Sequence, residues 1–558
     1  MGSDSPELTV IKHLNFRVKR AMSREKKNTL LIQGSILAGA GLITKLIGFL
    51  YRIPMSNMLG EEGNGIYSIA FSIYNVVLTL SSYSLPLAVS KLVSARIAKG
   101  EYKNARRVFK DALIFALVAG TVAMLVLLVG ADFFEKLYKC DGLAKPLRVL
   151  APTTFIVALL GAFRGFFQGH STMVPTAVSQ IAEQVINAGV SIAATYGFMK
   201  MYASSDIVSA YGAAGGTLGT LCGAAIALIY FLILFAFTRG TLEDGKEKED
   251  KSRDISDRMV FKQLFYTIIP VIISQTIYQV GYTLDSLIFN NIMAWKGQDK
   301  TVTTSLQGVY NTQYNQLINL PVAIATAMAS STLPGIVSSR VKGETEGVRE
   351  KITSVIKVNM VIAFPAAAGF SALAEPIMRF LFPSLVTYRA AAANLLMYGS
   401  AAIVFYALST ITTSILQGND QMKIPVIHCA VSLALHIVLI VVLLFATDLG
   451  VYALVIGNVT FPLVVSLLNC RSISKNLGYK WEIKRTFLMP FVCCLVMAAF
   501  TLISYKLTYM LSSNLYISTI VSIAISVVVY FAAIIKSPCF DRDEIKSLPF
   551  GTKLVRFK

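Results

Sequence analysis

The chain has 558 residues, of which 55% are hydrophobic and only 15% are charged, and its formal net charge is +20. Soluble domains carry about 25% charged residues, so the composition excludes an ordinary soluble enzyme or a string of soluble domains. Apolar stretches of roughly 20 residues recur along the chain, and each is long enough to cross a bilayer as a helix.

These stretches predict an all-α membrane protein with about fourteen transmembrane helices. In chain order they cover residues 29–58, 66–90, 111–133, 149–169, 174–200, 208–238, 263–293, 304–334, 354–376, 390–417, 424–446, 449–469, 486–508 and 514–535. Lys and Arg gather at both chain ends and in the loops after even-numbered stretches. The positive-inside rule therefore predicts that both termini are cytoplasmic, an N-in/C-in orientation. Because the basic charge follows topology, we predict no nucleic-acid partner.

Residues 1–28 are polar and basic and lack the apolar core of a signal peptide, so we expect a cytoplasmic extension without an assigned function. The first apolar stretch then carries two basic residues, Lys45 and Arg52. A basic side chain at the centre of a membrane helix costs about 2.5–3.5 kcal/mol on the insertion scale, so we expect each to face a cavity or a partner.

Lys45 and Arg52 share a helix face with Gly41 and Gly48, which have no side chains. Two cations separated by glycines predict a groove that binds a large anionic group. The alternative places Arg52 at the water interface, with its side chain extended towards the headgroups, and Lys45 paired inside the bundle.

Three further charged residues lie inside apolar stretches. Arg164, near the cytoplasmic end of the fourth stretch, either anchors the interface or contacts a phosphate group at the inner mouth of a pathway. Glu183 and Asp285 are predicted either to neutralise Lys45 or Arg52, or to bind a coupling cation or proton. Asp285 is the stronger coupling candidate because amide and tyrosine side chains share its helix face.

Four amide side chains recur at every fourth position of the eighth stretch: Gln307, Asn311, Asn315 and Asn319. On a regular α-helix they form one polar stripe. Amides in membrane helices hydrogen-bond either to a neighbouring helix or to a polar substrate. For the aligned stripe we favour the second role and predict substrate binding.

The seven cysteines and four histidines are scattered without metal-ligand spacing, so the sequence predicts no disulfide framework, no metal site and no cofactor. Cys140 is the one cysteine in a predicted outside loop. His436 is expected to be a packed, hydrogen-bonded residue. Coupling of transport to Na⁺, to H⁺ or to the membrane potential stays open.

Two pairs of segments match each other at nearly the same separation along the chain. Residues 65–101 resemble 308–344, with G-[IV]-Y, L-P-x-x-V-S and K-G-E in order, and residues 167–175 resemble 416–425. An even number of spans between the copies preserves their orientation, which predicts two six-helix parallel repeats with a substrate site between them. Two C-terminal helices lie outside the repeat.

The predicted domain organisation follows from these repeats and from the charged segments. It comprises a cytoplasmic N-terminal extension (1–28), an N-lobe (29–238), a cytoplasmic linker (239–262), a C-lobe (263–470), a cytoplasmic loop (471–485), two appended helices (486–535) and a cytoplasmic tail (536–558).

The motifs TKLIGFLYRIP, LGEEGNGIYSIAFSIYNVV, LPLAVSKLVSARIAKGEY and FRGFFQGHSTMVPTAVSQIAEQV, with the later QGNDQM, resemble the polysaccharide-transport branch of the multidrug/oligosaccharidyl-lipid/polysaccharide exporter superfamily. Within it they resemble the stage V sporulation protein B and MurJ-like lipid II flippases. The resemblance implies a V-shaped, two-lobed bundle that works by alternating access. It also implies an undecaprenyl-pyrophosphate cargo that carries a sugar or a peptidoglycan precursor.

The resemblance extends only partly to the individual residues of the family's substrate site. The first-span pattern S-R-x-x-G-F-x-R of lipid II flippases is matched by Lys45 and Gly48-Phe49, and by Arg52 with one residue inserted. Where those flippases tend to have an Asp-Arg pair in the eighth span, this chain has Asn315-Gln316. Arginines expected in the second span are absent. The implied anion site is therefore poorer in charge, and Lys45 and Arg52 carry more of the binding.

The sequence and the resemblance together predict a flippase of the bacterial plasma membrane that moves lipid II from the inner to the outer leaflet. An exporter of capsular or teichoic-type lipid-linked oligosaccharide is the first alternative, and a cation-coupled drug antiporter is the second. We predict no enzymatic activity. The expected partners are the lipid-linked oligosaccharide and membrane lipids, and we expect a monomer, alone or associated with cell-wall synthesis proteins.

Overall fold

The computed structural model describes residues 6–243, 256–341, 344–542 and 544. Helices account for the secondary structure of this described part, and no strand occurs in it. In chain order they are α1 (Pro6–Ser81), α2 (Leu85–Ala98), α3 (Tyr102–Tyr138), α4 (Ala144–Gly169), α5 (Val174–Met201), α6 (Val208–Glu243), α7 (Asp257–Trp295), α8 (Lys300–Gly308), the π-helical segment η2 (Val309–Tyr314), α9 (Asn315–Val341), α10 (Thr345–Ala372), α11 (Ala374–Leu381), α12 (Arg389–Gly399), α13 (Ala402–Gly418), α14 (Lys423–Ala446), α15 (Val451–Leu477), η3 (Lys484–Leu488), α16 (Met489–Ser512) and α17 (Leu515–Lys536).

The predicted all-α membrane fold is confirmed. Within the described residues, nine helices are long and apolar enough to cross a membrane, or ten when the bent pair α12 and α13 counts as one span. The number fourteen and the N-in/C-in orientation stay predictions. Much of the predicted linker (244–255) and of the predicted tail (543 and 545–558) lies outside the described residues.

Helix α1 contains the first predicted span (29–58) and most of the second (66–90), separated by a break at Gly60, and the second span ends in α2. Gly60 has φ 68° and ψ −171°, a left-handed region that suits a residue without a side chain. A straight helix would place Arg52 and Phe71 about 28 Å apart. Instead the Arg52 guanidinium carbon lies 5.9 Å from the centre of the Phe71 ring. The chain therefore folds back on itself at Gly60, and the two spans pack side by side.

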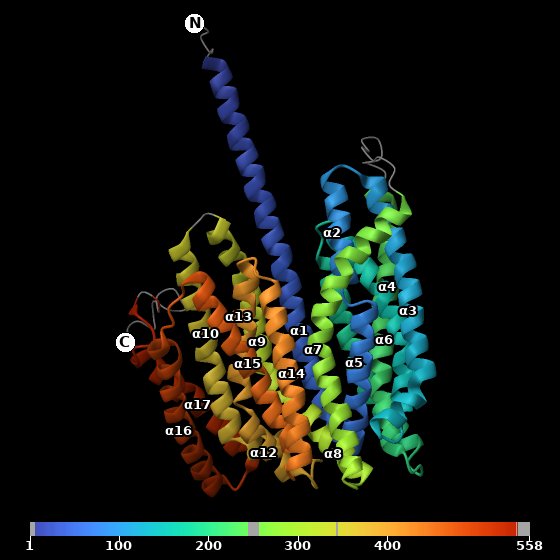
Figure 1. The fold of residues 1–558 in the computed structure, drawn as a ribbon, viewed down its shortest axis with the longest axis vertical. Helices are drawn as coiled ribbons and strands as arrows, with labels where there is room; N and C mark the ends of the chain where they lie inside the picture. The colour runs from blue at the N-terminus through green and yellow to red at the C-terminus, as the bar shows by residue number, and fades with distance from the viewer. Residues whose placement is uncertain (1–5, 244–255, 342–343, 543, 545–558) are drawn as a thin grey trace.

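The helices form two groups (Figure 1). One apolar core joins α2, α3, α4 and α6, and a second joins both parts of α1 with α3, α4 and α6. A third, larger core joins α8 to α15. Helix α7 belongs to both groups, since Val260, Leu264 and Ile268 pack into the first core while Phe289 and Ile292 pack into the third. In Figure 1 the ends of α2 and α10 lie apart at the top, whereas α8 and α12 lie together at the bottom.

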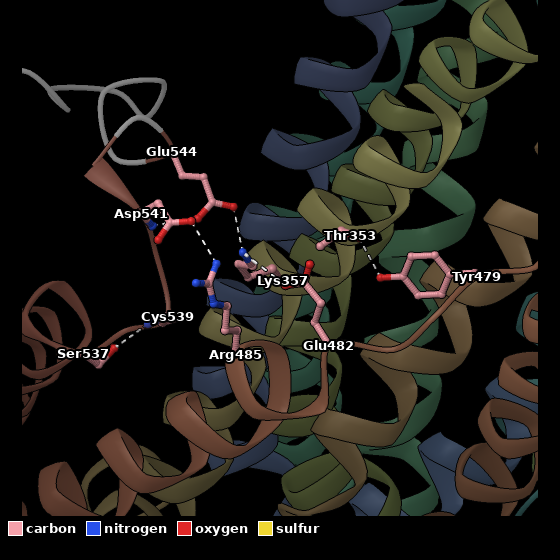
Figure 2. A network of polar contacts seen from close by, with 9 residues as sticks. All are labelled: Thr353, Lys357, Tyr479, Glu482, Arg485, Ser537, Cys539, Asp541 and Glu544. Atoms are coloured by element: carbon pink, nitrogen blue, oxygen red, sulfur yellow. Dashed lines mark hydrogen bonds and ion pairs between the residues drawn. The ribbon is translucent and has the colours of Figure 1, made fainter. Parts of the chain in front are cut away.

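A network of charged side chains joins the segment after α17 to α10 and to the region around η3 (Figure 2). We call this network the C-terminal clasp. The Lys357 ammonium on α10 lies 2.7 Å from Glu544 and 3.9 Å from Glu482, and its side chain is only 3% exposed. Nearby, Arg485 pairs with Asp541 at 2.9 Å, with both side chains exposed. The clasp therefore combines one buried cation with one surface ion pair.

The two ion pairs of the clasp are expected to differ in their contribution to stability. Glu544→Ala should lower the free energy of unfolding by about 1–3 kcal/mol, because the buried Lys357 ammonium loses its nearest carboxylate. Asp541→Ala is the matched control and should cost less than about 1 kcal/mol, since its ion pair is exposed. Denaturant unfolding of the purified protein, followed by tryptophan fluorescence, compares the two variants. Equal losses would contradict the expectation.

Candidate functional site

A cavity of about 540 Å³ lies between α1 and α9, and α5 contributes one side chain to its wall. The residues that line it are Thr44, Lys45, Gly48, Phe49, Arg52, Gln184, Gln316, Asn319, Leu320, Val322, Ala323 and Thr326. The two helices come from the two halves of the chain, so the cavity lies between the predicted lobes.

The cavity brings together the two basic residues of the first span. Lys45 is exposed and Arg52 is half-buried, and both line the wall on the α1 side. The Arg52 guanidinium lies against the Phe71 ring, and its Nε atom has no hydrogen-bond partner in the described part of the chain. None of the residues that line this cavity is acidic. The site thus presents two cations and several amides and hydroxyls, a donor set that suits phosphate oxygens.

The two glycines predicted to form the groove differ in their surroundings. Gly48 lines the cavity, and a Cβ atom there would lie 3.2 Å from the Gln184 side-chain nitrogen. The missing side chain at Gly48 therefore makes room for Gln184. Gly41 has no atom within 4 Å of a Cβ position and does not belong to the cavity wall.

The structure separates the four amides of the predicted stripe. Asn319 is exposed at the cavity. Asn311 donates to the Ser68 hydroxyl at 3.4 Å, and Asn315 accepts from Asn458 at 3.4 Å. Gln307 is fully buried, and neither polar atom of its side chain has a hydrogen-bond partner among the described residues.

The four amides do not share one environment along the eighth span, which contains the π-helical segment η2. Even on a regular α-helix each step of four positions turns by about 40°, so four such residues spread by about 120° around the axis. Their neighbours therefore differ although their spacing is constant. The expectation of a single cavity-facing stripe is corrected to one amide at the cavity and two, Asn311 and Asn315, in helix contacts.

Glu183 and Asp285 form ion pairs with residues other than Lys45 and Arg52. Glu183 lies 2.6 Å from Arg164, whose Nε also donates to Ser179 at 3.4 Å. The expectation that Glu183 or Asp285 neutralises Lys45 or Arg52 is therefore corrected: Glu183 pairs with Arg164, which is a closer cation on the adjacent helix. Arg164 is not part of the cavity wall.

Asp285 on α7 forms a buried pair with His436 on α14. The His436 Nδ1 lies 3.0 Å from the Gly457 carbonyl oxygen, and Nε2 lies 2.8 Å from an Asp285 oxygen. Because a carbonyl only accepts, Nδ1 carries a hydrogen, and the second contact needs a further proton between Nε2 and the carboxyl group. The pair thus holds one shared proton. The expectation that His436 is packed and hydrogen-bonded is confirmed.

Sequence reasoning did not select Gln184 and Gln316 as site residues. Gln316 lines the cavity while its side chain donates to the Phe49 carbonyl at 3.1 Å. Gln184 reaches the cavity from α5 because Gly48 has no side chain to occupy that space. A glycine facing a long amide on another helix leaves no spacing signal in either sequence segment, which is why the contact was not predicted.

Comparison with known proteins gives one family. A family profile described as "Polysaccharide biosynthesis protein" matches residues 30–340, and a second profile with the same description matches residues 299–386. The lipid II flippase MurJ of Bacillus subtilis (strain 168) is 26% identical over 496 residues, covering 86% of this chain and 90% of that protein. The stage V sporulation protein B of the same organism is 22% identical over 533 residues, covering 95% and 99%.

Solved structures with the same fold include two transporters. A lipid II flippase MurJ in an inward closed conformation superposes with a TM-score of 0.66 at 14% identity, covering 89% of this chain and 97% of that one. An inward-facing multidrug resistance MATE family transporter of the MOP superfamily gives a TM-score of 0.65 at 17% identity, covering 78% and 95%. At these identities the likeness is one of fold.

Proposed function

This chain belongs to the polysaccharide biosynthesis protein family, and from that membership we propose that it is a flippase for lipid-linked glycans. It is a multi-pass protein of the bacterial cell membrane. The cargo we propose is the peptidoglycan precursor lipid II, moved from the inner to the outer leaflet without chemical change. The relatives named above are a flippase and a sporulation protein, and neither name describes an enzyme.

The observation that carries the proposal is the cavity with two cations and, among the described residues that line it, no acidic side chain. A pyrophosphate-linked sugar cannot cross lipid alone, because its headgroup would lose its hydrogen bonds to water. In the cavity, Lys45 and Arg52 replace water at the pyrophosphate. Amides such as Gln184, Gln316 and Asn319 replace it at the sugar hydroxyls. The polyprenyl tail stays in the bilayer beside α1 and α9.

The same cavity argues against the alternative function, a cation-coupled drug antiporter. A multidrug resistance transporter shares this fold. A wall with Lys45 and Arg52 would repel a cationic drug at short range. The acidic residues Glu183 and Asp285 are each paired elsewhere. An exporter of capsular or teichoic-type repeats uses the same lipid pyrophosphate and is the nearest competitor.

The test measures lipid II on the outer leaflet of bacterial cells depleted of their resident flippase, with and without this protein. The expected result is that the protein restores outer-leaflet lipid II, and membrane abundance is measured alongside. Failure to restore lipid II at normal abundance would reject this cargo. Analysis of lipids that co-purify with the protein would then distinguish another undecaprenyl-linked glycan from no lipid-linked cargo.

A further inference from the structure

Two glycines, Gly65 on α1 and Gly308 on α8, form a very close contact between the two halves of the chain. A Cβ atom on Gly65 would overlap the Thr304 carbonyl group, with the carbonyl carbon only 2.7 Å away. A Cβ atom on Gly308 would lie 2.5 Å from the Gly65 nitrogen and 2.6 Å from the Glu61 oxygen. Backbone therefore touches backbone here, and no side chain fits between the two helices. We call this contact the glycine seam.

The seam relates equivalent positions of the internal repeat. Gly65 and Gly308 are the first residues of the matching segments, and Glu61 and Thr304 each lie four positions earlier. Each glycine lies against the carbonyl of the residue four positions before its partner, so the contact is self-complementary, as at a two-fold axis. Ser68 and Asn311, each three positions after its glycine, are also equivalent and lie 3.4 Å apart.

The seam closes one end of the cavity between the halves. On α1 the cavity residues Thr44 to Arg52 come before the seam, and on α9 the cavity residues Gln316 to Thr326 come after it. The chain thus runs from the cavity to the seam along α1, and from the seam to the cavity along η2 and α9. In Figure 1 this is the lower end, where α8 lies, opposite the N-terminus. The predicted orientation makes it the outer face.

Polar contacts between the halves surround the seam. Asn57 donates to the Leu381 carbonyl at 2.8 Å and accepts from the Ser384 hydroxyl at 2.8 Å. Glu61 accepts from the Tyr388 backbone nitrogen at 3.0 Å. Such contacts are individually weak and can break and re-form, whereas the backbone contact at the seam tolerates no added atom.

We propose that the glycine seam is the outer seal of the translocation pathway, and that the two glycines must separate for the cargo to leave the cavity outward. This inference rests on the proposed flippase function for its physiological meaning, but it concerns the closure itself. Because the seal is made by backbone, its tightness depends on the absence of two side chains rather than on a charge or a ligand.

Cys140 provides a native reporter of the seal. It lies in the connection between α3 and α4, is fully buried, and its sulfur lies 3.9 Å from the Thr304 hydroxyl. Burial raises the pKa of the Cys140 thiol to about 12, so the thiol is unreactive while the seal is closed. Thr304 lies on the same helix as Gly308, so we expect separation of the seam to move Thr304 away from Cys140 and to make the thiol accessible.

The experiment measures the rate of maleimide modification at Cys140 in the purified full-length protein in lipid nanodiscs, by mass spectrometry. Gly65→Ala and Gly308→Ala should each raise that rate roughly tenfold or more, since the closed state no longer fits and the open state gains population. Gly197→Ala is the matched control, because its Cβ would meet no atom within 4 Å. Its rate should equal that of the unaltered protein.

If the alanine variants do not accumulate, Asn57→Ala supplies a second test. It adds no bulk, removes contacts across the halves and should also raise the Cys140 rate, by a smaller factor. Unchanged Cys140 rates in well-folded seam variants, or in Asn57→Ala, would overturn the inference even if lipid II transport is present. A raised rate together with absence of lipid-linked glycan transport by the unaltered protein would instead reject the proposed function and leave the seal standing.

Discussion

Arg52→Ala is expected to reduce outer-leaflet exposure of the lipid-linked cargo by roughly tenfold or more. A hydrogen bond to a charged group contributes about 1.5–3 kcal/mol, and a loss of about 1.4 kcal/mol is a factor of ten. Arg52 lines the cavity, and its Nε atom has no hydrogen-bond partner among the described residues. We expect the loss to appear in transport, with membrane abundance unchanged.

Lys45→Ala is expected to act in the same direction. Arg52→Lys should retain part of the activity, because it keeps the charge but loses the planar donor pair. The control is Arg148→Ala, which removes an exposed arginine paired with Asp132 outside the cavity and should leave transport unchanged. Normal cargo exposure in both Arg52→Ala and Lys45→Ala, at equal abundance, would remove the proposed anion site.

The membrane fold could be predicted from sequence because it depends on the length of the apolar segments, whereas the internal repeat stays a prediction. Apolar length decides which segments cross lipid, and the match between 65–101 and 308–344 places Gly65 and Gly308 at equivalent positions. Family membership, inferred from the motifs, is confirmed by the profile over residues 30–340. Lys45 and Arg52 are brought to one cavity because helix α1 is regular between them.

Other parts of the site could not be predicted, for two physical reasons. The amide stripe assumed that a spacing of four positions keeps one face, but even on a regular α-helix three such steps turn by about 120° in total, so Gln307 and Asn319 need not share surroundings. The partners of Glu183 and Asp285 depend on which helices are neighbours. No periodicity within one helix reveals that Arg164 faces Glu183, or that His436 faces Asp285.

His436→Leu is expected to be the most destabilising of the substitutions considered, by about 3–5 kcal/mol, because it leaves the buried Asp285 carboxyl group without its partner. Asp285 is 4% exposed, so its carboxyl group depends on partners inside the protein. Asp285→Asn keeps a hydrogen-bonding side chain of the same shape and should cost less. The double variant should cost less than the sum of the two single variants, and denaturant unfolding of the four purified proteins measures this coupling.

The same pair supplies the test of ion coupling that we propose for Asp285. The contact to His436 holds one proton between α7 and α14, and α7 packs on both groups of helices. Gain or loss of that proton changes the charge at a place where the groups meet, and can therefore favour one arrangement over the other. Asp285→Asn fixes the site in an uncharged form, so transport should lose its response to an imposed proton or sodium gradient. If cargo exposure and its gradient dependence are both unchanged in a stably folded Asp285→Asn protein, the pair has a structural role and the coupling ion binds elsewhere.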